Sequence, residues 1–167
     1  ALRRGFKRIG DALNMSVDLK GSDWQTDQEE QNFAYEIEIY RPDIGELEEV
    51  IDFVKVDWEL WEHEVRMAFA DEIPSVHIAR KDGAVKAFSV HNGNNKGTGW
   101  FGPMGTHPDL RGLGIGSILL KRCLKDMKAA GHQTATIPWV DPIAFYAHHV
   151  GAQIDRVFWK FEKELSH

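Results

Sequence analysis

The segment from Met104 to Ser117 restricts the fold of this chain more than any other, because a strand pattern changes to a helix pattern through a glycine-rich loop. Residues 100–106 read as a strand, and the apolar side chains after Pro108 recur at intervals of three and four. Glycine stands at positions 112, 114 and 116. Glycine adopts backbone conformations that other residues resist, so several N–H groups can point into one hollow beside a helix N-terminus. The segment therefore predicts a strand, an anion-binding loop suited to a pyrophosphate, and a helix.

Arg111 would add a fixed positive charge at the edge of this anion site. The segment is not a P-loop, because no Gly-Lys-Ser or Gly-Lys-Thr follows the glycines. It is not the dinucleotide-binding fingerprint either. The spacing is Gly-x-Gly-x-Gly, and Asp126 lies inside the predicted helix where that fingerprint needs an acidic residue after a second strand. The glycine spacing alone leaves two interpretations open, a ligand-binding loop and a tight turn.

The hydrophobic periodicity elsewhere predicts a mixed sheet flanked by helices. Strands are expected at residues 33–40, 75–80, 84–92, 100–106 and 133–139, followed by a final hairpin or pair of strands over 152–163. Helices are expected near 44–55 and 57–70, after Pro108 until Gly131, and over 142–149.

Particular residues set several boundaries of these elements. Asp43 and Glu46 are expected to cap the first of these helices, and Lys81-Asp82-Gly83 to form a tight hairpin turn. Gly102-Pro103 requires a bulge or an edge position in its strand. Cys123 lies on an apolar helix face, which indicates a core thiol and not a nucleophile.

Composition excludes several classes of protein. Apolar residues make up 43% and charged residues 28% of the 167 residues, as in soluble globular domains. The net charge of −6 argues against DNA or RNA as the main partner. No apolar run approaches the ~20 residues of a membrane span, so no membrane partner is expected. A single cysteine excludes a disulfide framework and a multi-cysteine metal site, and it fits a reducing cytoplasm.

The first residues of the chain resemble its last ones. Residues 5–19 can be laid on residues 151–165, with the leading glycine and the apolar pattern in agreement. We interpret residues 1–19 as terminal strands of an upstream copy of the same domain, 20–32 as a polar linker, and 33–167 as the domain itself. Chance alternation is the alternative.

The alternation within residues 12–19 predicts a strand. Leu13, Met15, Val17 and Leu19 would share one face, and that face left in water would expose four large apolar side chains. We therefore expect this strand to pair with the sheet of the domain.

Two motifs give a family resemblance. Arg111, Gly114 and Gly116 match the pattern Arg/Gln-x-x-Gly-x-Gly/Ala, and the segment as a whole resembles the acyl-CoA-binding motif of the GNAT superfamily of N-acetyltransferases. Residues 145–152 are similar to the family's Phe-Tyr-x-x-x-Gly-Phe segment, with one extra residue before Gly151 and alanine in place of the last phenylalanine. The resemblance covers residues 33–165. It implies an α+β fold: a mixed, mostly antiparallel sheet of six to seven strands flanked by helices, with the acyl-CoA cleft between two splayed parallel strands.

The resemblance also implies roles for individual residues. The strand end that pairs with the pantetheine arm would be Met104, Gly105 and Thr106. The backbone N–H groups that hold the pyrophosphate would be those of Arg111, Gly112, Leu113, Gly114, Ile115, Gly116 and Ser117. Tyr146 would protonate the departing CoA thiolate, because a phenol with a pKa near 10 can donate to a thiolate whose conjugate acid lies near 8.5. An aromatic packing role is the alternative for Tyr146.

The general base is not evident from the sequence. Many family members carry a glutamate on the strand before the phosphate loop, but residues 100–104 contain no carboxylate. Asp141 is the best substitute, although it could equally cap the helix that follows Pro142, and it falls near a family asparagine that contacts CoA. The weaker candidates are His77, His91, His107, His148 and His149.

The resemblance implies an acetyl-CoA-dependent N-acetyltransferase that acts on a primary amine of a small molecule such as an amino sugar, without a metal. A non-catalytic acyl-CoA-binding half of a tandem protein is the alternative, and an upstream GNAT domain is a further expected partner. The aromatic residues Trp58, Trp61, Trp100, Phe101 and Trp139 would suit stacking on a sugar or ring, or core packing.

Overall fold

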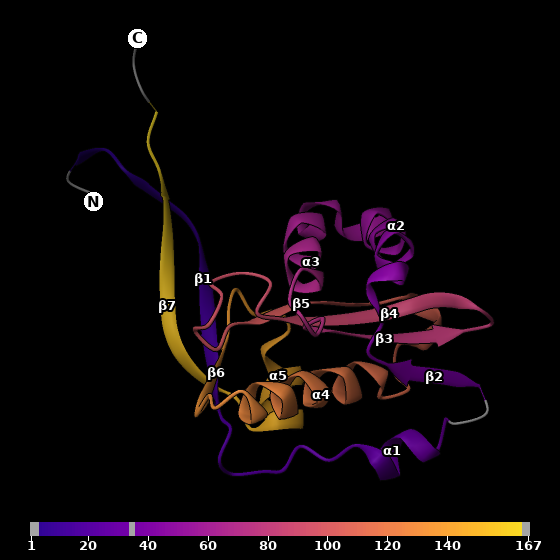
Figure 1. The fold of residues 1–167 in the computed structure, drawn as a ribbon. Helices are drawn as coiled ribbons and strands as arrows, with labels where there is room; N and C mark the ends of the chain where they lie inside the picture. The colour runs from indigo at the N-terminus through magenta and orange to yellow at the C-terminus, as the bar shows by residue number, and fades with distance from the viewer. Residues whose placement is uncertain (1–3, 34–35, 165–167) are drawn as a thin grey trace. The chain divides into compact units, whose positions relative to one another are not determined.

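The computed structural model describes residues 4–33 and 36–164 and divides into two compact units. The larger unit spans residues 18–135, and the smaller unit combines the chain up to residue 17 with the chain from residue 136 onward. Each unit has a β-sheet of its own (Figure 1).

The sheet of the larger unit has four strands in the order β2-β3-β4-β5, and all neighbours are antiparallel. Its strands are β2 (Ile37–Tyr40), β3 (Val76–Lys81), β4 (Ala84–His91) and β5 (Phe101–Thr106). One face is covered by α2 (Leu47–Trp58) and α3 (Glu62–Phe69), and the other by α4 (Ile115–Ala129) (Figure 1). Short 3-10 turns lie at Ile44–Glu46, Glu59–Trp61 and Pro108–Leu110.

Both faces of this sheet are buried, and β4 shows why its sequence permits that. Phe88 belongs to the apolar cluster under α2 and α3, whereas its neighbour Ala87 belongs to the cluster under α4. Successive side chains of a strand point to opposite faces. A near-continuous apolar run such as residues 85–90 is therefore the pattern of a strand covered on both sides.

The predicted boundary residues are confirmed. Asp43 accepts a hydrogen bond from the Gly45 N–H at 2.7 Å, and the Asp43 N–H donates to Glu46 at 3.1 Å. Asp82 and Gly83 both have positive φ, 52° and 75°, which matches the twist of a two-residue hairpin. Gly102-Pro103 lies in β5, an edge strand of the sheet, beside a register shift between Ser89 and His91.

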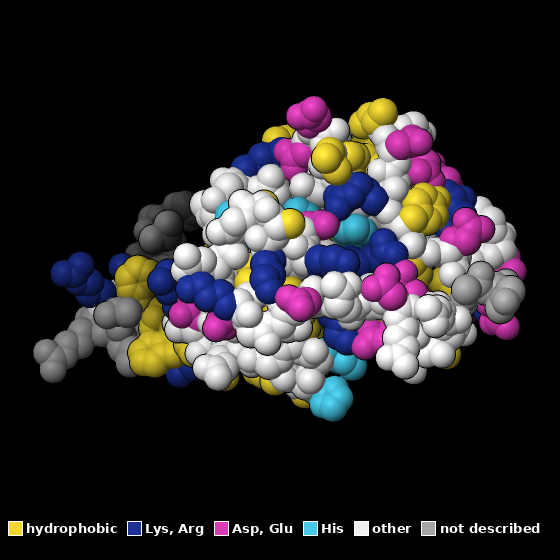
Figure 2. Space-filling view, turned by 60° about the horizontal axis from the view of Figure 1, so that its bottom comes forward, with side chains coloured by type: hydrophobic (Ala, Val, Ile, Leu, Met, Phe, Trp, Pro, Cys, Tyr) yellow, Lys and Arg dark blue, Asp and Glu magenta, His cyan; other side chains and the backbone are white. Residues whose placement is uncertain are grey.

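The segment expected as a polar linker lies along α4 in the larger unit. It contains the short helix α1 (Asp27–Gln31). Glu29 pairs with Lys121 at 2.5 Å, and Glu30 accepts two hydrogen bonds from Arg122 at 2.7 and 2.6 Å. In Figure 2, Lys and Arg side chains lie next to Asp and Glu across the face that carries α1 and α4. These pairs hold the segment against the helix.

The smaller unit contains a three-stranded sheet in the order β6-β1-β7. Its strands are β1 (Lys7–Asp18), β7 (Gln153–Glu162) and β6 (Thr134–Ile137), which crosses the boundary between the units, and its helix is α5 (Ile143–Val150). β1 pairs antiparallel with β7 from Lys7 opposite Glu162 to Ser16 opposite Gln153. The expectation that the N-terminal segment forms a strand paired to a sheet is confirmed.

Two predictions of strand extent are wrong. β2 begins at Ile37 and not at Phe33, because the Phe33 N–H donates to Glu30 in a turn that continues α1; residues 34 and 35 of that prediction lie outside the described residues. Residues 152–163 contain one long strand, β7, and not a hairpin, because β7 pairs with β1. The described residues contain seven strands, within the predicted six to seven, but these strands form two sheets.

Candidate active site

The loop before α4 holds its glycines in conformations that other residues avoid. Gly112 has φ of +76° and Gly114 has φ of +87°, both in the left-handed region. A Cβ added at either position would meet no atom within 4 Å. The space beside this backbone is therefore open to a ligand.

The N-terminus of α4 adds N–H groups to the same loop. In an α-helix the first N–H groups have no partner within the helix; here the Ile118 N–H is bonded to the Gly114 carbonyl at 3.2 Å, which leaves Ile115, Gly116 and Ser117 as the first turn. The first turn of this helix contains no acidic side chain. The helix dipole and these N–H groups together favour an anion at this end.

Two residues fix the position of the loop. Leu110 is buried in the cluster under α4, so it anchors the turn that precedes Arg111. The Arg111 side chain is anchored in turn, because its Nε–H donates to the Thr106 carbonyl at 3.1 Å. The guanidinium therefore stays at the junction between β5 and the glycines, where the sequence predicts a positive charge.

Within its sheet, β5 has a partner on one side only. Met104 lies opposite Ser89, and Gly105 lies opposite Phe88, in the pairing with β4. An edge strand can pair with an extended ligand through its backbone. The predicted pantetheine strand, Met104 to Thr106, and the predicted pyrophosphate loop thus follow each other within the larger unit.

An aromatic pair lies against this strand. A Cβ at Gly105 would come within 2.8 Å of both Trp58 and Phe88, so only glycine fits beneath these rings. Trp58 and Trp61 stack in parallel, with ring centroids 6.0 Å apart and planes at 6°. Both tryptophans are half-buried, so each has ring surface to offer to a ligand.

The two predicted catalytic residues belong to the smaller unit. Tyr146 lies on α5, and burial raises its pKa to about 12, so the phenol carries its proton at neutral pH. Asp141 is exposed. The interpretation of Asp141 as a helix cap is wrong, because α5 has Pro142 at its N-cap position and no side-chain hydrogen bond there.

The predicted cosubstrate residues therefore come together in the larger unit, and the predicted catalytic residues lie in the other. Of the weaker base candidates, His107 accepts a hydrogen bond from the Asp109 N–H at 3.3 Å as a turn cap. His148 and His149 contact each other on α5, with ring centroids 4.9 Å apart.

The remaining candidates, His77 and His91, belong to a partly buried cluster that sequence analysis missed. The Oδ2 atom of Asp126 lies 2.6 Å from Arg41 Nη2, 2.6 Å from His77 Nε2 and 3.4 Å from His91 Nε2. These residues are separated by up to 85 positions, and only the packing of α4 on the sheet unites them. An acidic residue in the middle of an apolar helix pattern is the one signal that pointed to them.

The protonation of this cluster follows from its contacts. Burial alone would raise the pKa of Asp126, but the hydrogen bond from His77 and the positive charge of Arg41 hold it well below its usual range. Burial lowers the pKa of His77, so its ring is neutral, its Nε2–H donates to Asp126, and Arg41 supplies the permanent positive charge. His77 is thus committed to a structural carboxylate, whereas the buried Nε2 of His91 lies near it without a hydrogen bond.

Two further features lie away from the predicted site. Cys123 is buried against Ser89 at 3.1 Å, and burial raises the pKa of its thiol, which confirms a core role. A hollow of about 580 Å³ between α1 and β2 is lined by seven residues: Asp27, Glu30, Gln31, Ile37, Glu38, Ile39 and Tyr40. Its three carboxylates would repel an anionic cosubstrate.

Over residues 4–33 and 36–164, no group of three or more His, Cys, Asp or Glu residues is arranged to hold a metal ion. None of the helices in this described part is long and apolar enough to cross a membrane.

Known structures share this fold. A GCN5-related glucosamine N-acetyltransferase region of a fungal multi-domain GH3 β-N-acetylglucosaminidase matches with a TM-score of 0.77 at 18% identity, over 96% of this chain and 22% of that one. A GCN5-related N-acetyltransferase from Sphaerobacter thermophilus matches with a TM-score of 0.68 at 15% identity, over 95% and 52%. A GNAT-family acetyltransferase from Colwellia psychrerythraea matches with a TM-score of 0.63 at 15% identity, over 94% and 57%.

The chain thus spans less than two thirds of each of these solved chains. No curated protein sequence matched it. A family model described as the acetyltransferase (GNAT) family matches residues 24–151, which is most of the chain and includes the loop, α4 and Tyr146. The chain belongs to the GNAT acetyltransferase family.

Proposed function

We propose that this protein transfers the acetyl group of acetyl-CoA to the primary amine of a small molecule, with an amino sugar as the first acceptor to test. The observation that supports this most is the open glycine loop at the N-terminus of α4, directly after an edge strand. The loop offers N–H groups to the pyrophosphate, and the strand offers backbone groups to the pantetheine arm.

Each proposed role matches the chemistry of its residue. The amine nitrogen attacks the thioester carbonyl carbon, the carbon–sulfur bond breaks, and the sulfur leaves as a thiolate. Tyr146 gives its hydroxyl proton to that sulfur; its raised pKa, about 12, ensures that the proton is present before the reaction. Asp141, an exposed carboxylate, takes the proton that the attacking amine loses.

The acceptor is proposed to lie against Trp58 and Trp61. Trp58 contacts Gly105 of the proposed pantetheine strand, so this aromatic pair adjoins the strand that carries the thioester arm. The apolar face of a sugar ring stacks well on a half-exposed indole. The fungal region of similar fold is named as a glucosamine N-acetyltransferase, which makes glucosamine a natural first acceptor.

One observation favours a second function. β5 (Phe101–Thr106) contains no carboxylate, although many family members carry their base there. A domain that binds acetyl-CoA without turnover, as one half of a tandem protein, would have no need of a base.

Release of CoA separates the two functions. Acetyl-CoA binding is measured by calorimetry, and CoA release is measured with glucosamine, a polyamine, an arylalkylamine and a lysine peptide. We expect saturable binding and the fastest release with glucosamine. Binding without release from any amine would favour the non-catalytic function, and no binding would contradict both.

A substitution tests the acceptor site separately. Trp61→Ala removes one stacking surface, so we expect the KM for the amine to rise about tenfold, the effect of losing roughly 1.4 kcal/mol of ring contact. The KM for acetyl-CoA serves as the internal control and is expected to stay the same. An unchanged amine KM would move the acceptor away from this pair.

A further inference from the structure

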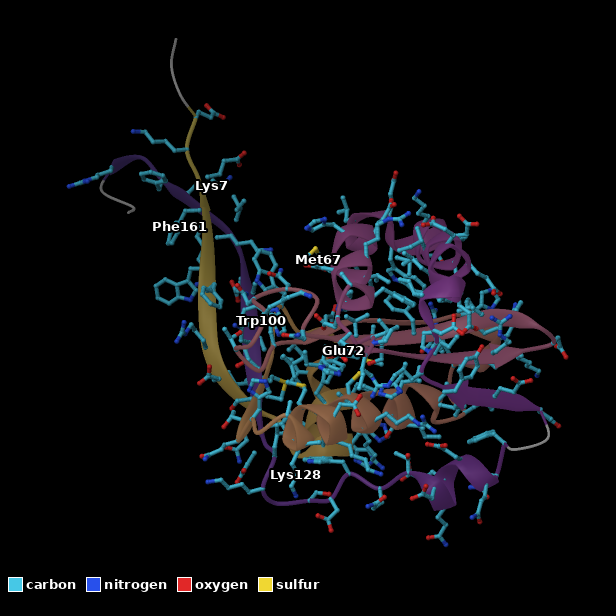
Figure 3. All side chains as sticks on the ribbon, in the orientation of Figure 1. Lys7, Met67, Glu72, Trp100, Lys128 and Phe161 are labelled. Carbon is cyan, nitrogen blue, oxygen red and sulfur yellow. The ribbon has the colours of Figure 1, made fainter. Side chains whose placement is uncertain are left out.

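The ribbon of β1 and β7 is unevenly buried along its length. At one end, Met15 and Val17 of β1 are each 1% exposed. At the other end, large apolar side chains face solvent: Ile9 is 56% exposed, Val157 52% and Trp159 62%. We call residues 6–11 and 157–162 the outer half of the ribbon. Figure 3 labels Lys7 and Phe161 on its two strands.

An outer half of this kind is unfavourable in water. Two paired strands without a covering layer are marginally stable at best. In the sheet order β6-β1-β7, strand β7 is also at an edge, so its outward N–H and C=O groups are open to another chain. Both features indicate a partner that covers this end of the ribbon.

The two strands can be aligned by their apolar pattern and leading glycine. Laying residues 5–19 on 151–165 sets Ala12 at the position of Phe158. In the structure, Ala12 lies opposite Phe158, and the flanking pairs are Asp11 with Trp159 and Leu13 with Val157. Asp11 is equivalent to Val157 in that alignment, and Leu13 to Trp159. Each strand therefore meets the equivalent part of the other, as across a twofold axis through Ala12 and Phe158.

This symmetry accounts for the uneven burial. Rotation about this axis would place the buried end of the ribbon on the outer half. Each position at the buried end therefore has an equivalent position in the outer half. Ala152 is 5% exposed, whereas its equivalent, Phe6, is 37% exposed. Met15 is 1% exposed, whereas its equivalent, Phe161, is only half-buried. Positions that are covered at the buried end of the ribbon thus have exposed equivalents in the outer half.

We propose that β1 is the last strand of an upstream domain of the same fold in the longer polypeptide, and that this domain covers the outer half of the ribbon. The two domains then exchange their terminal strands across the pseudo-twofold axis. β7 completes the upstream domain, as β1 completes this one. The proposal concerns domain assembly and holds or fails independently of the acetyl-transfer chemistry.

The test compares the complete natural polypeptide with the 167-residue chain. The first step is to read the coding sequence that precedes the codon of Ala1. If that sequence encodes no domain of this fold, the proposal is overturned. Hydrogen exchange is then followed in peptides that cover residues 6–11 and 157–162. We expect exchange at least about 100-fold slower in the complete polypeptide than in the 167-residue chain, because the covering domain blocks local opening.

Protection must also be independent of protein concentration. Protection that grows with concentration would mean that a second copy covers the ribbon, and it would overturn the proposal. Equal exchange in the two proteins would overturn it as well.

A substitution at the pseudo-twofold axis tests the proposal independently of the comparison of exchange rates. Phe158→Asp places a charge at the proposed interface, and Ile73→Asp is the matched control, because Ile73 is 65% exposed in the larger unit. We expect Phe158→Asp to abolish the protection of the outer half in the complete polypeptide and Ile73→Asp to leave it. Equal loss of thermal stability from Phe158→Asp in the complete and the 167-residue proteins would show a role within this domain alone and would contradict the proposal.

Discussion

The two ends of α4 differ in whether their polar groups already have partners within the protein. At the N-terminal end, Gly112 and Gly114 expose backbone to open space, and the first turn of the helix contains no acidic side chain. Near the C-terminal end, Asp126 is met by Arg41 and His77, each at 2.6 Å. One end has N–H groups available for a ligand, and the other has its charge already paired.

This difference indicates that one end of α4 binds a ligand and that the other end stabilises the fold. Exposed N–H groups cost little while water satisfies them, so a fold can keep them in reserve for an anion. A partly buried carboxylate without partners would cost several kcal/mol, so it persists only when paired. We therefore expect substitutions at the two ends to affect different quantities, ligand affinity at one end and stability at the other.

Gly114→Val is expected to have the largest effect. A β-branched residue resists the φ of +87°, so the backbone N–H groups turn away and the new side chain enters the ligand space. Loss of two charge-assisted hydrogen bonds, roughly 1.5 kcal/mol each, raises the Kd for acetyl-CoA at least about 100-fold. Calorimetric titration measures it.

Gly83→Val is the matched control, because Gly83 has φ of +75° with open space around it in the β3–β4 turn. It carries the same backbone strain without the ligand site. We expect it to lower thermal stability and to leave the acetyl-CoA Kd unchanged. Equal affinities in Gly114→Val and the parent would place the cosubstrate elsewhere.

Tyr146→Phe tests whether a residue outside α4 acts in the chemical step without contributing to acetyl-CoA affinity. Only the proton for the leaving thiolate is lost, so we expect kcat to fall roughly 100-fold while the Kd for acetyl-CoA stays within twofold. Because the pKa of Tyr146 is raised to about 12, its loss of a proton should not limit kcat of the parent below pH 10 or so.

Tyr40→Phe serves as the control for removal of a tyrosine hydroxyl. Its hydroxyl donates to Glu46 at 2.5 Å, so this variant loses a hydrogen bond that supports the fold. We expect lower stability and an unchanged kcat. A Tyr146→Phe enzyme as fast as the parent would remove Tyr146 from the mechanism.

The N-terminal end of α4 was predictable from the sequence because the residues that form it are close together in the chain. Strand, glycines and helix follow one another within Met104–Ser117, and positive φ at glycine needs no distant contact. The capping box at Asp43 and the turn at Gly83 were predictable for the same reason.

The C-terminal end was not predictable, because it is assembled from distant segments. Arg41 directly follows β2, His77 lies in β3, and Asp126 lies in α4. No spacing rule connects such positions. The extents of β2 and β7 were misjudged for a related reason, because α1 and β1 determine where those strands begin and how they pair.

Asp126→Asn should reduce stability without changing affinity. The amide removes the negative charge that Arg41 Nη2 and His77 Nε2 both contact at 2.6 Å. We expect the free energy of unfolding to fall by about 2 kcal/mol, measured in urea. The exposed pair of Glu48 and Arg66 is the control, and Glu48→Gln should change stability far less. A weaker acetyl-CoA affinity in folded Asp126→Asn would break the division between the two ends.

His77→Gln is expected to have the smallest effect, and it concerns pH. Because burial lowers the pKa of His77 in the folded protein, the unfolded chain takes up a proton first as the pH falls below about 6.5. The free energy of unfolding therefore declines as the pH falls from 7 toward the folded pKa. Glutamine keeps an N–H donor for Asp126 and does not titrate, so the variant should lose less stability between pH 7 and 5. Urea unfolding at pH 7, 6 and 5 measures this slope, with the exposed His63→Gln as control. Parallel slopes in His77→Gln and the parent would show that the fold does not lower the pKa of His77, and the histidine would then share a proton with Asp126 as the pH falls, at the paired end of α4.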